Sequence, residues 1–156
     1  MSTSPKLPTI EKEMANGYRI DGVLFDFDGT LTRPGALDFA VLKGVLGCPE
    51  GVPVLEFMAG VAEANRRDDM AGQLHRFEMD GAALSAPNAD AERIVAAIRA
   101  AGLPVGILTR NSRAAIYRAL ENFPDLSMAD IDTMVTRDDP VRIKPSGEGV
   151  LLAAER

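Results

Sequence analysis

The sequence has one cysteine, one histidine and no tryptophan in its 156 residues. The single cysteine, Cys48, excludes an internal disulfide and is compatible with a reducing compartment. The single histidine, His75, has no second histidine or cysteine close to it in the sequence, so we expect it to be an ordinary helix residue. The composition therefore gives no sign of a disulfide scaffold or of a cysteine–histidine zinc site.

Long apolar runs are also missing: none approaches the roughly 18 residues that span a bilayer. The N-terminus is polar and contains proline, without the apolar region of a signal peptide. Acidic residues outnumber basic ones, 23 to 17, for a net charge of −6, which argues against a nucleic-acid or anionic-membrane partner. We expect a soluble, cytoplasmic protein.

The most informative stretch is residues 23–31, VLFDFDGTL. A short apolar run that ends in a turn signal is typical of a buried strand in a parallel sheet, here residues 23–27. Asp26 and Asp28 stand at its end, where an uncompensated buried charge is costly. A divalent cation with oxygen ligands, Mg²⁺ above all, would compensate them.

From residue 88 onward, apolar strands alternate with amphipathic helices. We predict a helix capped by Asp90 and ended by Gly102, a helix capped by Ser112 or Asn111, strands at residues 104–109 and 132–136, and a last helix at residues 147–156. A short helix is also expected at residues 10–16. Such alternation predicts an α/β fold with a Rossmann-like parallel sheet of about three strands.

Residues 34–87 contain no convincing strand. Leu37, Val41 and Val45 share one helical face, a short helix can follow from Val54, and apolar residues between positions 61 and 84 recur at the spacing of one long amphipathic helix. We therefore predict two domains: a discontinuous α/β core, residues 1–33 and 88–156, and an inserted all-helical domain, residues 34–87.

Polar residues fall where all three predicted strands end, and ligands of open parallel sheets bind beyond the carboxyl ends of the strands. Asp26 and Asp28, two residues apart on an extended chain, share a face. They could serve as nucleophile and acid/base, although Asp-Gly also favours a simple turn. Thr109, with the N–H groups of the next helix, could hold an anion or merely satisfy a strand end. Lys144 could stabilise charge or be a solvated lysine.

Three segments, DFDGTL at residues 26–31, ILTRNS at residues 107–112 and Lys144-Pro145, resemble the haloacid dehalogenase superfamily. Within it they are similar to phosphatases with a small helical cap after the first strand, such as phosphoglycolate phosphatases. The resemblance implies an aspartyl phosphate on Asp26, acid/base work by Asp28 and charge stabilisation by Lys144. It further implies Mg²⁺ on the Asp26 side chain and the Asp28 backbone carbonyl, with substrate contacts from Thr109, Arg110, Asn111 and Gly29.

The expected function is Mg²⁺-dependent hydrolysis of a small phosphorylated metabolite that the cap selects. Two alternatives stay open. A phosphosugar mutase would use the same aspartyl phosphate, and a non-catalytic phosphate-binding or regulatory module could share the fold.

The sequence departs from the family after Lys144, where the family has a further strand with paired acidic residues. Only residues 145–156 follow, so the sequence is either a truncated version of a longer protein or a natural protein that does without the motif, and we expect impaired turnover. Asp138 and Asp139 precede Lys144 and could lie near the rim of the site. The first strand would then be an open edge, which favours self-association.

Overall fold

The computed structural model describes residues 9–10, 17 and 19–156. The helix predicted at residues 10–16 falls almost entirely outside the described residues. None of the helices in the described part is both long and apolar enough to cross a membrane.

Three parallel strands form the sheet, in the order β1-β2-β3. They are β1 (Val23–Phe25), β2 (Val105–Leu108) and β3 (Thr133–Val135). This confirms the predicted α/β fold with a parallel sheet of about three strands. Each strand is shorter than predicted: β1 stops at Phe25 because the chain turns at Asp26, whose side chain accepts the Phe27 N–H.

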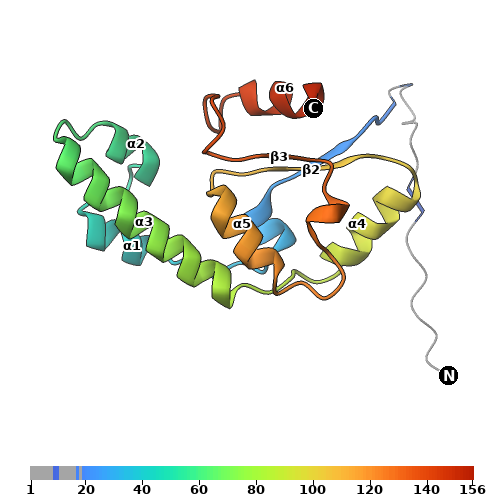
Figure 1. The fold of residues 1–156 in the computed structure, drawn as a ribbon, viewed down its shortest axis with the longest axis horizontal. Helices are drawn as coiled ribbons and strands as arrows, with labels where there is room; N and C mark the ends of the chain where they lie inside the picture. Colours follow the sequence, from blue (N-terminus) through green and yellow to red (C-terminus); the bar gives the residue numbers. More distant parts are fainter. Residues whose placement is uncertain (1–8, 11–16, 18) are drawn as a thin grey trace.

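Helices cover the two faces of the sheet unequally (Figure 1). On one side lie α4 (Ala91–Ala100) and α5 (Arg113–Leu120), and on the other α6 (Glu148–Glu155), which packs on β2 and β3. Side chains alternate between the two faces of a strand. Val105 and Ile107 therefore point to the same face, into the core between β2 and helices α4 and α5, and are fully buried. The edge strand β1 leaves Leu24 37% exposed.

The predicted helix ends are partly right. Ser112 caps α5 by accepting the Ala115 N–H, and Gly102 ends α4 with a left-handed φ of +69°. Asp90 stands at the start of α4, but its side chain makes no cap there and instead pairs with Arg93. Within α4, Ile94 is 40% exposed, because the helix turns Val95 toward the core.

Three helices and no strand lie between residues 34 and 87, as predicted: α1 (Phe39–Leu46), α2 (Val54–Ala59) and α3 (Ala64–Leu84). We call α1–α3 the helical module. It has a small apolar core of its own, to which Leu42, Leu46, Val54, Met70 and Leu74 contribute. The buried face of α1 is thus Leu42 and Leu46, while Val41 and Val45 are exposed. Its status as a separate domain stays a prediction.

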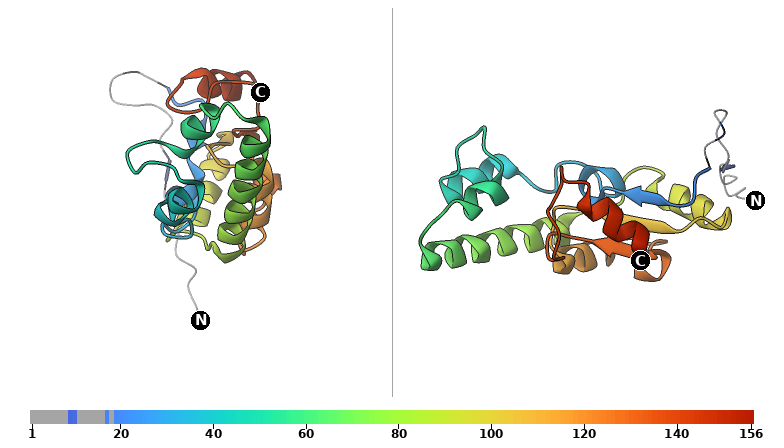
Figure 2. Two further views of the ribbon diagram at one scale, coloured as in Figure 1. Left: turned by 90° about the vertical axis from the view of Figure 1, so that its left-hand side faces the viewer. Right: turned by 90° about the horizontal axis from the view of Figure 1, so that it is seen from above.

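The long helix α3 joins the helical module to the α/β core. Its C-terminal half lies against α5, as the views in Figures 1 and 2 agree. The Asn122 amide at the end of α5 donates to the Ala82 carbonyl at 2.9 Å and the Ser85 carbonyl at 3.0 Å. These bonds satisfy carbonyls at the end of α3 and fix where the module leaves the core.

Gly81 allows the chain to pass close to α3. A Cβ on Gly81 would lie 2.4 Å from Leu37 Cδ2 and 3.0 Å from the Ala36 carbonyl oxygen, whereas a Cβ on Gly72 of the same helix would meet only the end of Arg76. We expect Gly81→Ala to lower the free energy of unfolding by about 1–3 kcal/mol through overpacking. Gly72→Ala should raise it by up to about 1 kcal/mol through helix propensity.

Urea unfolding of both variants tests this packing. Equal effects of the two substitutions would contradict the close approach of residues 36–37 to α3.

Candidate active site

A tight turn after β1 holds the two predicted acidic residues. Gly29 has a φ of +76°, a conformation that glycine adopts without strain, and its N–H donates to the Thr32 hydroxyl at 3.1 Å. Phe27 and Leu31 anchor the turn in the core. Gly29 therefore shapes the backbone around Asp28.

Asp26 and Lys144 form an ion pair at the edge of the sheet. The Lys144 ammonium lies 2.8 Å from Asp26 Oδ1, and the same oxygen accepts the Phe27 N–H at 2.8 Å. The Asp26 side chain is 50% exposed and that of Lys144 28%. The structure thus brings these two predicted residues together, with the carboxylate still reachable from solvent.

Asp28 faces Asn111 across the same edge. The Asn111 amide lies 3.2 Å from Asp28 Oδ2 and 3.4 Å from Oδ1. Burial by the surrounding protein raises the pKa of the Asp28 carboxyl above its usual range. The Asn111 amide and the Lys144 charge oppose this rise, while the negative charges of Asp26 and Glu78 add to it.

Thr109 is buried directly after β2, and its hydroxyl accepts the Asn111 N–H at 3.1 Å. The Ser112 N–H donates to Asn111 Oδ1, and the Arg113 N–H donates to Asp138 Oδ2. These N–H groups before and at the start of α5 are occupied, so the prediction of an open N–H cradle for an anion is wrong for them. The Thr109 hydroxyl proton is one donor that this loop can still offer.

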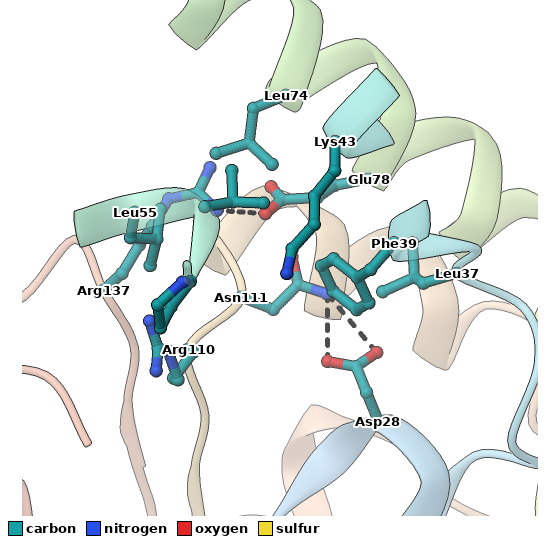
Figure 3. A pocket seen from close by; sticks show the side chains of 12 residues that line it. Asp28, Leu37, Phe39, Lys43, Leu55, Leu74, Glu78, Arg110, Asn111 and Arg137 are labelled. Atoms are coloured by element: carbon teal, nitrogen blue, oxygen red, sulfur yellow. Dashed lines mark hydrogen bonds and ion pairs between the residues drawn. The ribbon is translucent and has the colours of Figure 1, made fainter. Parts of the chain in front are cut away.

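A cavity of about 280 Å³ opens beside Asp28, between the loops after the strands and the helical module (Figure 3). Arg110, predicted to contact substrate, lines it and forms an ion pair with Glu56 of α2 at 2.6 Å. Sequence reasoning missed three other charged residues of its wall: Lys43, Glu78 and Arg137.

Glu78 is the most buried of them, only 3% exposed on α3. It pairs with Arg137 and accepts the Ser112 hydroxyl at 3.0 Å. The sequence did contain a signal for this cluster. Glu78 falls on the inward stripe of α3 between Leu74 and Gly81, where a carboxylate needs a partner.

Asp139 is engaged in the core and does not complete a metal site. It accepts hydrogen bonds from Arg113 and Arg156 at 2.8 Å each and from the Thr136 N–H at 2.9 Å. Burial acts to raise the pKa of Asp139, but the bonds from Thr136 and Arg156 and the Arg113 charge together lower it below its usual range. Asp139 thus ties β3 to α5 and α6.

The donor set at the edge of the sheet is small. No group of three or more histidine, cysteine or acidic residues in the described part of the chain could hold a metal ion together. Asp26 and Asp28 alone are hard oxygen donors of the kind that Mg²⁺ prefers, and Mg²⁺ commonly completes its shell with water and substrate phosphate. The residues present fit such a water-rich site.

The geometry defines an α/β protein with an acidic pair, a buried threonine and a lysine at the carboxyl edge of a parallel sheet. The model of the haloacid dehalogenase-like hydrolases matches residues 20–156. The chain belongs to this family, as the sequence motifs predicted. No curated protein matches the chain in a sequence comparison.

Solved structures share the fold. A candidate phosphoglycolate phosphatase from Haemophilus somnus superposes with a TM-score of 0.61 at 14% identity, over 86% of this chain and 70% of that one. CbbY from Rhodobacter sphaeroides, solved with xylulose 1,5-bisphosphate, gives 0.60 at 18% identity, over 87% and 72%. A candidate β-phosphoglucomutase from Thermotoga maritima gives 0.58 at 19% identity, over 88% and 70%.

The raised pKa of Asp28 predicts a stability effect. Folding favours the protonated carboxyl, so stability falls as the pH rises from the unfolded-state pKa of Asp28 to its higher folded-state pKa, and the full cost of the ionised carboxylate is present above that. We expect Asp28→Asn to be more stable than the parent at neutral pH, with the difference shrinking as the pH falls through that pKa.

Thermal unfolding from pH 8 down to the ordinary carboxyl pKa of 3.8 measures this difference. The exposed Asp80→Asn in α3 serves as the control. A gain in stability that stays constant with pH, or a loss of stability at neutral pH, would contradict a raised pKa for the Asp28 carboxyl.

Proposed function

We propose that this chain is a Mg²⁺-dependent phosphomonoester hydrolase that acts on a small phosphorylated metabolite. One observation carries the proposal: Asp26, Asp28, Thr109 and Lys144 come from three separated segments and meet at one sheet edge, where Asp28 lines a cavity. Membership of a hydrolase family supports the same reaction class.

In the proposed first step, an Asp26 carboxylate oxygen attacks phosphorus. The new bond joins Asp26 to phosphorus, and the ester P–O bond breaks with its electron pair on the leaving oxygen. Asp28 gives its proton to that oxygen, and the raised pKa of Asp28 suits a general acid. In the second step water attacks phosphorus and Asp28 takes the water proton. The bond between phosphorus and the Asp26 oxygen breaks, which restores the Asp26 carboxylate and releases inorganic phosphate.

The other residues hold charge in place. The Lys144 ammonium forms an ion pair with the Asp26 carboxylate. It would stay between this carboxylate and the incoming phosphate, where its positive charge would lower the repulsion between the two anions. The Thr109 hydroxyl would donate to a phosphate oxygen, and Asn111 keeps Asp28 oriented. We propose that Gly29 contributes to the substrate site through the turn that it permits, and that Arg110 contacts substrate in the cavity.

Mg²⁺ would be held by the Asp26 side chain and the Asp28 backbone carbonyl, and when bound it would screen phosphate charge. With no third acidic ligand in the described residues, we expect weak binding and slow turnover. That shortage also favours the second candidate function, a phosphate-binding module without turnover.

Hydrolysis of p-nitrophenyl phosphate with added Mg²⁺ tests the proposal. We expect a kcat below the enzyme median of about 10 s⁻¹, lost with EDTA. Asp26→Asn should lower the kcat by at least about 10³-fold because the nucleophile is gone. Asp21→Asn, an exposed aspartate just before β1, should leave the rate unchanged.

Rapid turnover that survives EDTA, or that Asp26→Asn retains, would contradict the proposal. Phosphate binding without any turnover would favour the binding module. Activity that requires an added sugar bisphosphate would point to a mutase.

We also propose that the β1 edge supports self-association. In the described part of the chain, β1 pairs with β2 alone. Leu24 on β1 is 37% exposed, and Val150 and Leu151 on α6 are 46% and 66% exposed. Unpaired apolar edges tend to pair with other chains. Light scattering at high protein concentration should show a mass above that of the monomer, and Leu24→Lys should lower it.

A parent protein that stays a monodisperse monomer at high concentration would contradict this proposal.

A further inference from the structure

A carboxylate lies buried where α3 passes the edge of the sheet. Glu78 is 3% exposed and stands on the inward stripe of α3, between Leu74 and Gly81. Charges are costly to bury, and replacing a buried ion pair with apolar residues is often neutral or stabilising. The pairing of Glu78 with Arg137 therefore does not by itself explain why this position carries a charge.

Both oxygens of Glu78 hold the loops that follow the strands. Oε1 pairs with the Arg137 guanidinium in the loop after β3, and Oε2 accepts the Ser112 hydroxyl at 3.0 Å, at the start of α5. Figure 3 shows the Glu78 and Arg137 side chains meeting in the cavity wall. One side chain of the helical module thus joins two loops of the α/β core.

The two partners of Glu78 both hold Asn111. The Ser112 N–H donates to Asn111 Oδ1 at 2.8 Å, and the Arg137 N–H donates to the Asn111 backbone carbonyl at 3.3 Å. Glu78, Ser112, Asn111 and Arg137 therefore form a closed ring of three hydrogen bonds and one ion pair, which we call the Glu78 ring.

The Glu78 ring determines which end of the Asn111 amide faces Asp28. An asparagine amide has an accepting oxygen at one end and two N–H donors at the other. Because the Ser112 N–H occupies the oxygen, the Asn111 nitrogen turns to the Asp28 carboxyl, 3.2 Å from Oδ2. An amide turned the other way would set its oxygen against the carboxylate oxygens and repel them.

We infer that Glu78 is a positioning residue, which acts through Ser112 and Arg137 to hold Asn111 in the orientation that fixes the Asp28 side chain. The inference rests on the proposed function, in which Asp28 is the acid/base. Proton transfer needs a fixed geometry between the acid and the leaving oxygen, so a loosened Asn111 should slow the steps that depend on Asp28.

The side-chain amide signals of Asn111 in a proton–nitrogen NMR spectrum test the inference without turnover. An Asn111→Ser variant assigns these signals by their loss. The double variant Glu78→Leu with Arg137→Leu removes the ring without leaving an unpaired charge, so its midpoint of urea unfolding should stay close to that of the parent. In this variant we expect the Asn111 signals to move toward those of an exposed asparagine or to broaden.

Two further variants make the comparison specific. Ser112→Gly cuts the bond to Glu78 but leaves the ion pair in place, and glycine at an N-cap costs little stability. It should change the Asn111 signals in the same way, and it decides the question if the double variant does not fold. Asp80→Asn, which removes a negative charge from an exposed position of α3, should leave these signals unchanged.

Dependence on the leaving group connects Asn111 to the work of Asp28. The value of kcat/KM covers the reaction up to departure of the leaving group. p-Nitrophenolate leaves without an acid, whereas the more basic phenolate benefits from one. The double variant should lower kcat/KM for phenyl phosphate at least about threefold more than for p-nitrophenyl phosphate. Asp80→Asn should keep the ratio of the parent.

Equal losses for the two esters, or Asn111 signals that stay in place in the folded double variant or in Ser112→Gly, would overturn the inference and leave the proposed function standing. A parent protein that hydrolyses neither ester would refute the proposed hydrolysis. The NMR comparison would then still decide whether Glu78 holds Asn111.

Discussion

The Asp26–Lys144 ion pair is the interaction on which the site depends. It joins the end of the first strand to the loop beyond the last one, at a separation of 2.8 Å. A half-exposed carboxylate gains little stability from such a pair. We interpret the pairing as positioning, because it holds an ammonium against a half-exposed Asp26 carboxylate, where phosphate charge would arrive in the proposed reaction.

The two aspartates differ because their surroundings differ. Asp26 lies at the solvent edge beside a cation, whereas Asp28 is crowded by protein and faces an amide and two further carboxylates. The raised pKa of Asp28 suits the acid/base role that we propose for it, and the half-exposed Asp26 carboxylate beside Lys144 suits the proposed nucleophile. The turn from Phe27 to Leu31, with Gly29 at positive φ, is what makes the two environments possible.

Much of this was predictable from local patterns. The parallel sheet followed from apolar runs closed by turn residues, and the helical stretch from periodic spacing at positions 61–84. The meeting of Asp26 with Lys144 followed from the rule that ligands bind beyond the carboxyl ends of strands. What local patterns missed are side chains paired across elements, since no sequence spacing links Glu78 to Arg137 or Arg110 to Glu56. The engaged Arg113 N–H at the start of α5 was missed for the same reason, because Asp138, which accepts it, comes from the loop after β3.

Covalent phosphorylation of Asp26 is the central claim, and mass spectrometry tests it directly. In an Asp28→Asn variant incubated with Mg²⁺ and p-nitrophenyl phosphate, the good leaving group needs no acid, while the water step lacks its base. The account predicts that one phosphoryl group accumulates on the peptide that contains Asp26. A protein that stays unmodified, or a phosphoryl group found on any other residue, would contradict it.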